Sequence, residues 1–392
     1  MKHLALVPLI GGMAIGAEKA LGTPPEAVLS YSAFNGNDKL YMNYLAQRGL
    51  NTKRYDIEND ELPEFKEIDV VTSVCPCAGL STVTTRAKGT AAGCQQNEWM
   101  KVSTRHILST TRPRVLVGEN APALATNSGR PVAQILKEIG EEHGYSMQLV
   151  KTSTHMHGIP QQRVRSFFIM YRDMGPQEIQ YSHNEYPGTW LEYLNSFEVQ
   201  EETDFVVPEW HAELFELGRR VKEMKEEEYL TFLRGTKRTT FSICLEDSPA
   251  VTTYIKEHEE SENPVKARVA RQITRCRGKL AQGLGYWDGS MSYRSQKNYN
   301  AVMWRTIQTF WRNDLKRPIG PREQMRLMGL PEDFEVPRGN LNAICQNVPT
   351  CTAEWVVREA VAALNGERND WDGEGSLDGI LRQNNIGMYH MK

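Results

Sequence analysis

The sequence predicts an α/β fold in which helices cover a doubly wound parallel sheet. From Met1 to about Arg172, short apolar runs alternate with amphipathic stretches, which is the pattern of such a sheet. The apolar runs are LALVPLI, AVLSYSA, IDVVTSV, RVLVGEN and VRSFFIMY. Apolar residues recur at helical spacing between positions 132 and 143, so this segment is expected to be an amphipathic helix. The other helices predicted here are 14–21, 39–47 and 98–108.

A second, smaller domain is predicted in the middle of the chain, where the composition changes. The sequence is acidic from about residue 173 to 262 and then becomes basic. Between Lys266 and Arg317 there are twelve Lys or Arg and only two Asp, with Tyr and Trp interleaved. Such a mixture is expected of a surface that contacts phosphates and bases, although a solvated helix face above core aromatics is the alternative.

Compact αβ character returns after Arg317 and includes a predicted helix over 352–364. We therefore expect a first domain over 1–175, resumed by 317–366, with the second domain inserted at 176–316. The tail, 367–392, has few apolar residues and is expected to be loosely held.

The overall composition is that of an ordinary globular protein, with 392 residues, of which 40% are hydrophobic and 24% charged. A net charge of -3 excludes a uniformly basic nucleic-acid coat. Seven scattered cysteines fit a reducing compartment better than a disulfide framework. No apolar run reaches the roughly 18 residues that a membrane helix needs, and the first run is too short for a signal peptide. The sequence thus predicts a cytoplasmic protein without a membrane partner.

A candidate nucleophile follows the third apolar run, where the sequence reads Cys-Pro-Cys. Chemistry in open α/β sheets is located at the carboxyl ends of strands, so Cys77 stands where a thiolate would be useful. Two inert core cysteines are the alternative. A zinc site formed with His155 and His157 is a further one, which we disfavour, so no metal is expected.

Two other strand ends carry charged residues. RVLVGEN delivers Glu119 at its end, where burial would raise the carboxyl pKa and let the group hold a proton for a base. Arg163 and Arg165 are spaced by two in an extended segment and so share a face that can grip a phosphate or a base carbonyl. An ordinary capping carboxylate and a salt-bridged strand edge are the alternatives.

Taken in order, these segments resemble the cytosine carbon-5 methyltransferase family, whose hallmarks are a PCQ loop, an ENV segment and a Q-x-R-x-R segment. IGGMAIGAEKALG is similar to the family's glycine-rich cofactor turn, and YDIEND to its acidic segment. RPIGPREQMRLMGLPEDF and QNVPTCTAEWVVREAVAAL resemble its closing segments. The resemblance covers about residues 4–172 and 317–364. It implies a class I methyltransferase-type sheet with an inserted target-recognition domain.

The resemblance also implies an activity and assigns roles to residues. The Cys77 thiolate would add to carbon 6 of a cytosine flipped out of DNA, Glu119 would bind its nitrogen edge, and Arg165 would contact its carbonyl with help from Arg163. Residues expected to bind S-adenosylmethionine are Ile10, Gly11, Gly12, Gly16, Asp56, Pro76 and Asn347. Residues expected to contact double-stranded DNA are Gln161, Arg271, Arg275, Arg277, Lys279 and Arg294.

The sequence departs from the family pattern mainly near the expected cofactor site. Leu9 replaces a glycine of the turn, and Ser32 stands where an acid usually meets the ribose, with Asn35 or Asp38 as substitutes. Ala78, Ala121 and Gln346 are further departures. The identity of the methyl donor is therefore more open than the covalent chemistry.

The alternatives are a DNA-binding homologue that is inactive or uses an altered donor, and a methyltransferase that acts on tRNA. Retention of Cys77 and Glu119 speaks against an inactive protein, and the long insertion favours duplex DNA. We expect a monomer. The sequence does not reveal which DNA site is recognised.

Overall fold

The computed structural model describes residues 1–75, 80, 95–126, 128–181, 184–198, 209–236, 238–283, 311–312, 315, 317–337, 340–371 and 387–390. These residues form two compact units, one made of Met1–Pro187 with Met325–Lys392 and the other of Gly188–Gln324. The first unit is therefore discontinuous in sequence, because the chain leaves it and later returns.

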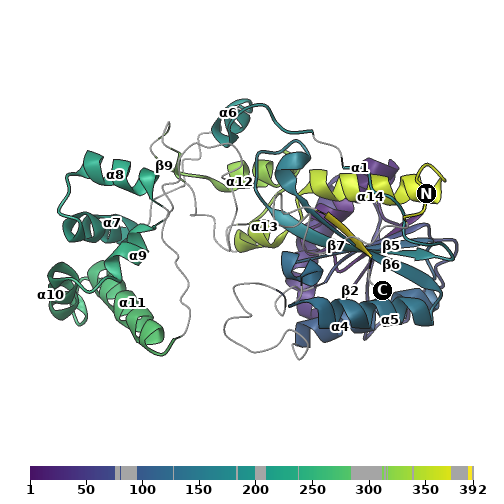
Figure 1. Ribbon diagram of the computed structural model, residues 1–392, viewed down its shortest axis with the longest axis horizontal. Coiled ribbons are helices and arrows are strands. Elements are labelled where there is room, and N and C mark those ends of the chain that lie inside the picture. Colours follow the sequence, from purple (N-terminus) through teal and green to yellow (C-terminus); the bar gives the residue numbers. More distant parts are fainter. Residues whose placement is uncertain are drawn as a thin grey trace. The chain divides into compact units, whose positions relative to one another are not determined.

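The first unit is built on an eight-stranded sheet with the strand order β10-β6-β7-β5-β4-β1-β2-β3 (Figure 1). From β3 to β5 the neighbouring strands are parallel, whereas β7 runs antiparallel to both β5 and β6. The predicted α/β class is thus confirmed. The strands are β1 (His3–Leu6), β2 (Ala27–Ser30), β3 (Lys53–Asp56), β4 (Val70–Val74), β5 (Val115–Asn120), β6 (Tyr145–Ser153), β7 (Val164–Arg172) and β10 (Gly387–His390).

Helices cover both faces of this sheet, which explains why every residue of β1, β2, β4 and β5 is buried. As Figure 1 shows, α1 (Gly12–Leu21) and α14 (Thr350–Leu364) lie on one face, whereas α4 (Gln95–Thr110) and α5 (Arg130–Glu142) lie on the other. The other elements of this unit are α2 (Asn35–Gln47), α13 (Asn342–Gln346), and the 3-10 helices η1 (Ser32–Phe34), η3 (Pro122–Ala125) and η4 (Thr154–Met156).

The first and last helices of this unit are joined by close packing at Gly16. A Cβ on Gly16 would lie 2.5 Å from both the Cβ of Ala353 and the carbonyl oxygen of Thr350. Both distances are shorter than any real Cβ contact, so a side chain at this position would push α14 away from α1. The glycine therefore allows α14 to complete the hydrophobic layer on its side of the sheet.

Replacing Gly16 by alanine is expected to lower the free energy of unfolding by about 1–3 kcal/mol, the usual cost of overpacking. Gly36→Ala is the matched control, because Gly36 lies in α2 and a Cβ there would meet no atom within 4 Å. A helical glycine in open space should tolerate alanine or gain up to about 1 kcal/mol from it. Urea unfolding measures both, and equal midpoints would contradict the close packing.

The tail contacts the first unit at two points. Residues 387–390 pair antiparallel with β6 as its outer neighbour, so the prediction of a loosely held extension is wrong for them. Earlier in the tail, Arg368 forms a 2.9 Å ion pair with Glu359 of α14, and Asp370 accepts a hydrogen bond from Gln177. These contacts attach the start of the tail to the first unit.

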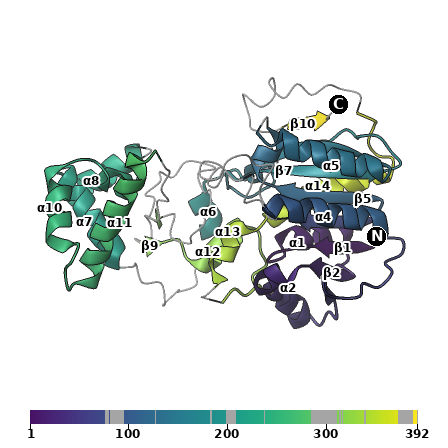
Figure 2. The ribbon, with the colours of Figure 1, turned by 90° about the horizontal axis from the view of Figure 1, so that it is seen from below.

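The described part of the second unit is mainly helical (Figure 2). Its largest apolar cluster is formed by buried side chains of four helices and includes Leu214, Phe241, Val251 and Ile273. Its elements are α6 (Trp190–Asn195), α7 (Glu209–Val221), α8 (Glu226–Gly235), α9 (Thr240–Cys244), α10 (Pro249–His258), α11 (Pro264–Ala281), and strands β8 (Trp311–Arg312) and β9 (Arg317–Pro318), with α12 (Pro321–Leu327) at the return to the first unit. Among the described residues of both units, no helix combines the length and apolarity that crossing a bilayer requires.

Candidate active site

The predicted catalytic residues that the structure describes, Glu119, Arg163 and Arg165, lie with Asp56 at one edge of the sheet, where the parallel strands end. Asp56 closes β3 and Glu119 lies one residue before the end of β5. The register pairs Val74 with Glu119 and Glu119 with Phe167, so Cys75 and the start of β7 lie beside Glu119 at this edge. Chemistry is located at such carboxyl ends in open α/β sheets.

Glu119 is a buried carboxyl group held by one guanidinium. Its side chain is 6% exposed, and its Oε1 lies 2.8 Å from Nε of Arg165, whose own side chain is 20% exposed. Burial raises the pKa of Glu119, while the positive charges of Arg165 and Arg163 partly oppose that shift. The site therefore contains a carboxyl group that holds its proton to a higher pH than an exposed one, beside a cation that reaches solvent.

Arg163 has a different environment from Arg165, although the two are only two positions apart in the sequence. It is 3% exposed, and one of its terminal nitrogens donates to the carbonyl oxygens of Cys345 at 2.6 Å and Asn347 at 3.0 Å. Asn347 in turn accepts a hydrogen bond on Oδ1 from the backbone N–H of Gly12. Arg163 thus connects β7 to the start of α1 through the segment after α13.

Replacing Arg163 by alanine is expected to lower the free energy of unfolding by about 2–4 kcal/mol, because two buried carbonyls lose a charged donor. Arg163→Lys retains a donor and should recover part of the loss. Arg165→Ala is the comparison, since its partly exposed guanidinium is bound to no buried carbonyl outside its own segment. Urea unfolding that ranks Arg165→Ala as the more damaging change would contradict this assignment.

Of the two cysteines in the Cys-Pro-Cys segment, the structure describes only Cys75. Cys77 and Pro76 lie outside the described residues, as does Arg294. Cys75 is 2% exposed, and its Sγ lies 3.2 Å from Oγ of Ser73 and 3.4 Å from Oγ of Ser103. Burial raises the pKa of the Cys75 thiol, so this cysteine is enclosed and poorly suited to attack a ligand.

The ends of β2 and β3 form a polar corner. Ser32 donates a hydrogen bond to Oδ2 of Asp56, while the backbone N–H of Glu58 donates to Oδ1 at 2.9 Å. These hydrogen bonds lower the pKa of Asp56 despite the opposing effect of desolvation. A carboxylate that stays ionised is a suitable acceptor for an amino group, as the prediction for Asp56 requires.

Asp38 is not available as the ribose-binding acid that the sequence offered in place of Ser32. It is fully buried and pairs with Arg54 at 3.2 Å, while Arg54 also donates to the carbonyl oxygen of Tyr31. Burial raises the pKa of Asp38 to about 6. The ion pair attaches α2 to β3. The spacing of Asp38 and Arg54 in the sequence did not indicate this role.

The glycines of the predicted cofactor turn are explained first by packing. Gly11 has φ +100, and a Cβ there would fall 2.2 Å from Cδ2 of Tyr41, which occupies that space. A Cβ on Gly12 would lie 2.1 Å from the carbonyl oxygen of Val348. Ile10 is fully buried beside them. Together with Gly16, these residues hold α1 against α2 and α14.

Of the residues predicted to contact DNA, Arg271, Arg275, Arg277 and Lys279 all lie on α11. Arg271, Arg275 and Lys279 are exposed, whereas Arg277 is half-buried and donates to the carbonyl oxygen of Glu246. Gln161 is fully buried and donates to the carbonyl oxygen of Leu327, so its assignment to a DNA surface is wrong: it binds the last residue of α12.

The histidines that a zinc site would need are engaged elsewhere. Nε2 of His157 lies 2.8 Å from Oγ1 of Thr152, and the His157 ring stacks on the Trp355 ring with their centroids 4.5 Å apart. His155 contacts Oγ of Ser153 through Nδ1. These contacts give both rings a structural role.

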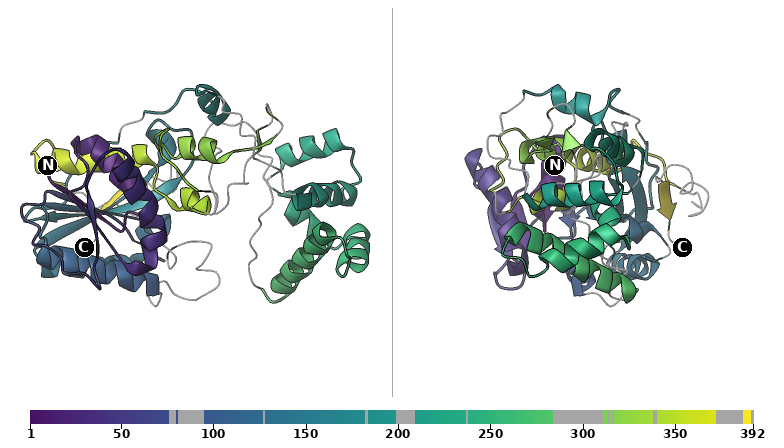
Figure 3. Two further views of the ribbon diagram at one scale, coloured as in Figure 1. Left: turned by 180° about the vertical axis from the view of Figure 1, so that it is seen from behind. Right: turned by 90° about the vertical axis from the view of Figure 1, so that its left-hand side faces the viewer.

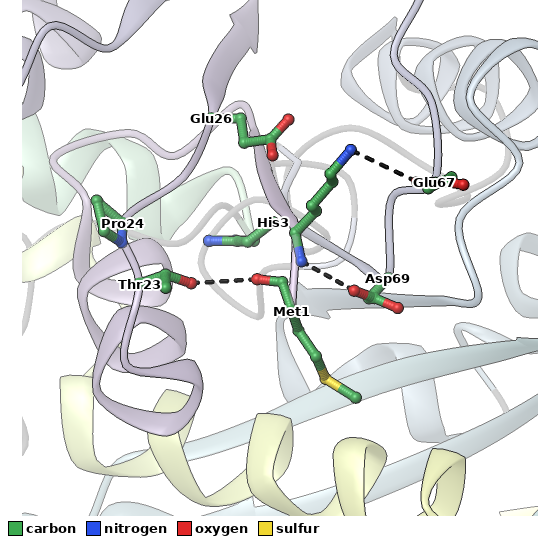
Figure 4. A pocket seen from close by; sticks show the side chains of 8 residues that line it. Met1, His3, Thr23, Pro24, Glu26, Glu67 and Asp69 are labelled. Carbon is green, nitrogen blue, oxygen red and sulfur yellow. Dashed lines mark hydrogen bonds and ion pairs between the residues drawn. The ribbon is translucent and has the colours of Figure 1, made fainter.

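A cavity, drawn in Figure 4, is lined by Met1, Lys2, His3, Thr23, Pro24, Glu26, Glu67 and Asp69. It lies at the edge of the sheet opposite to Glu119. His3 begins β1 and pairs with Val70 at the start of β4, so this is the amino edge. The cavity is therefore separate from Glu119 and Arg165.

The fold is similar to that of known methyltransferase structures. A putative DNA modification methyltransferase encoded within an E. coli prophage matches with a TM-score of 0.56 and 14% identity, over 93% of this chain and 99% of that one. The Entamoeba histolytica methyltransferase EhMeth matches with a TM-score of 0.54 and 12% identity, over 93% and 98%. A Spodoptera frugiperda DNMT2 mutant matches with a TM-score of 0.51 and 12% identity, over 92% and 99%.

At these identities the structural likeness establishes the fold alone, and no curated protein matches the sequence. The family is established by the sequence model for C-5 cytosine-specific DNA methylase, which matches residues 1–350. That range includes Cys77, Glu119, Arg163 and Arg165, together with Asp56 and Asn347. The chain therefore belongs to the C-5 cytosine-specific DNA methylase family.

Proposed function

We propose that this protein transfers a methyl group from S-adenosylmethionine to carbon 5 of a cytosine flipped out of double-stranded DNA, through a covalent adduct with Cys77. The observation that carries the proposal is the buried Glu119 carboxyl group, with its raised pKa, in contact with Arg165 at the carboxyl edge of the sheet. A protonated carboxyl and a guanidinium side by side match the nitrogen edge and the carbonyl of a cytosine.

The chemistry follows from the low nucleophilicity of carbon 5. The Cys77 thiolate forms a bond to carbon 6, and the electron pair displaced from the ring is stabilised by the proton that Glu119 offers to ring nitrogen 3. Arg165 donates to the carbonyl oxygen at position 2. Carbon 5 would then take the methyl group from the donor, which leaves as S-adenosylhomocysteine. A base removes the proton from carbon 5, and the electron pair of that C–H bond expels the sulfur from carbon 6 to regenerate the thiolate.

Arg163 supports this arrangement as a positioning residue. Its hydrogen bonds to the carbonyls of Cys345 and Asn347 fix the strand that carries Arg165. The Arg163 guanidinium is 3% exposed, and one of its terminal nitrogens already donates to two main-chain carbonyls, whereas the Arg165 side chain is 20% exposed. We therefore assign base contact to Arg165 alone.

The residues at the same edge fit the methyl donor at two points. Nδ2 of Asn347 is buried and makes no hydrogen bond in the described part of the chain, so a donor beside Gly12 awaits an acceptor such as a carboxylate. Asp56 supplies an ionised acceptor for an adenine amino group. S-adenosylmethionine would supply the electrophilic methyl group, and these residues would orient it.

Covalent capture tests the proposal directly. Duplex DNA in which 5-fluorocytosine replaces cytosine is incubated with the full chain and S-adenosylmethionine. Carbon 5 then carries fluorine in place of hydrogen, and a base cannot remove it after methyl transfer, so the covalent adduct is trapped. The expected result is a complex that survives denaturation and forms only when the donor is present. Peptide mapping should locate the bond at Cys77, and a donor-dependent adduct at another residue, or none, would overturn the proposal.

A further inference from the structure

Helix α11 carries a one-sided basic surface that the catalytic residues do not account for. It contains six Lys or Arg and no Asp or Glu among its 18 residues. We propose that α11 lies in the major groove of duplex DNA and reads base edges through Arg271, Gln272 and Arg275. This inference deepens the proposed function, on which it rests for the choice of DNA, by naming the element that selects the target sequence.

The arrangement of side chains on α11 supports insertion by one face. Arg268, Arg271, Arg275 and Lys279 are all exposed and recur at intervals of three or four residues, which places them on a single stripe. Ala267, Ala270, Ile273 and Cys276 are buried on the opposite side. The stripe extends for about 17 Å between its first and last cations, at 1.5 Å per residue.

Within the described residues, the cations of α11 have no counter-ions, unlike several other cations of the same unit. In the described part of the chain none of the six forms an ion pair. By contrast, Lys222 and Arg238 both pair with Glu246, and Arg219 pairs with Glu216. Unneutralised charge concentrated on one exposed helix face is complementary to the phosphates that line a nucleic-acid groove.

The diameter of an α-helix such as α11 fits the major groove of duplex DNA better than that of duplex RNA. Helix α10 packs against α11, and a short turn joins them, closed by Asn263, whose side chain accepts hydrogen bonds from the backbone N–H groups of Val265 and Lys266 (Figure 3). A helix about 10–12 Å across fits the major groove of B-form DNA, which is about 12 Å wide. The deep, narrow major groove of A-form RNA does not admit it.

The contacts on α11 divide its side chains between two tasks. The Arg268 guanidinium lies 4.8 Å from the centroid of the Trp210 ring, which fixes it near the first turn as a phosphate contact. In the middle of the stripe, a terminal nitrogen of Arg275 donates to Oε1 of Gln272 at 2.7 Å. Arginine and glutamine are the side chains that bind guanine and adenine bidentately in the major groove. Arg277 points inward and takes no part.

The test measures sequence preference in the absence of catalysis. The full chain without donor selects ligands from a pool of random-sequence duplex DNA, which is sequenced. The proteins compared are the wild type and the variants Arg275→Lys, Arg275→Ala and Lys256→Ala. Lysine retains the charge but not the bidentate geometry, so Arg275→Lys is expected to lose the preference at one base pair while its salt dependence stays unchanged. Lys256 is an exposed cation on α10, and its removal should leave the preference intact.

The outcomes are distinct from those of the catalytic proposal. If Arg275→Lys keeps the wild-type preference, and Arg275→Ala weakens all sequences equally, α11 contacts phosphates only and the inference is overturned. It is also overturned if duplex RNA of the selected sequence competes as well as the DNA. Because binding is measured with no donor, loss of preference in these variants stands even if covalent capture at Cys77 fails.

Discussion

Replacing Cys77 by serine is expected to reduce methyl transfer by at least about 10³-fold, because a hydroxyl at neutral pH is a far weaker nucleophile than a partly ionised thiol. Binding of duplex DNA should change little, since the sulfur acts after the base has been bound. Transfer of labelled methyl groups to DNA, together with an equilibrium binding titration, separates the two effects.

Cys75→Ser is the matched control, because it makes the same chemical change two residues away. Cys75 is enclosed between Ser73 and Ser103, with the pKa of its thiol raised by burial. Its replacement is expected to affect folding more than chemistry and to leave donor-dependent capture by 5-fluorocytosine DNA in place. Capture that is lost with Cys75→Ser and retained with Cys77→Ser would exchange the roles of the two cysteines.

Replacing Glu119 by glutamine is expected to lower kcat/KM by about 10²–10³-fold and to change its pH dependence. The proposed role requires the protonated carboxyl group, whose pKa is raised by burial. The wild-type rate should therefore fall as the pH rises through that raised pKa. Glutamine has no proton to lose there, so this falling limb should disappear.

A pH profile of single-turnover transfer measures this difference, and Glu138→Gln serves as its control. Glu138 is an exposed carboxylate on α5, so its variant should reproduce the wild-type profile. If the Glu119→Gln variant keeps the same falling limb as the wild type, another group carries the proton and the role given to Glu119 is wrong.

The sheet was largely predictable because its central strands are buried on both faces. Uninterrupted apolar runs such as Val70–Val74 signal this environment in the sequence itself. β6 gave no such signal, since Gln148, Lys151 and Thr152 interrupt it, and they are buried only because β7, β10 and the neighbouring segments cover them. The short strand β3 was also missed, because it is an edge strand with the polar sequence KRYD and begins at the exposed Lys53.

Site residues were predictable where chemistry follows a strand end, and less so where a role depends on distant partners. The spacing of Arg163 and Arg165 placed both at the site but did not distinguish them. The difference comes from main-chain carbonyls more than 180 residues away, which bind Arg163 alone. Gln161 was likewise assigned to a surface, because nothing in its local sequence indicates that it is buried and binds the end of α12. Helix α11 was easier, since its charge pattern is contained within a single element.

The hydrogen bond from Gly12 to Asn347 joins residues that are 335 positions apart. Non-local closure of this kind slows folding, because the entropy of a long loop is lost before the contact forms. On a ribosome that adds about 5–20 residues per second, the face of the sheet that α14 covers stays bare for tens of seconds after β1 has emerged. The nascent chain therefore passes through a stage in which that apolar face is exposed to chaperones or to other chains, and synthesis of α14 ends it.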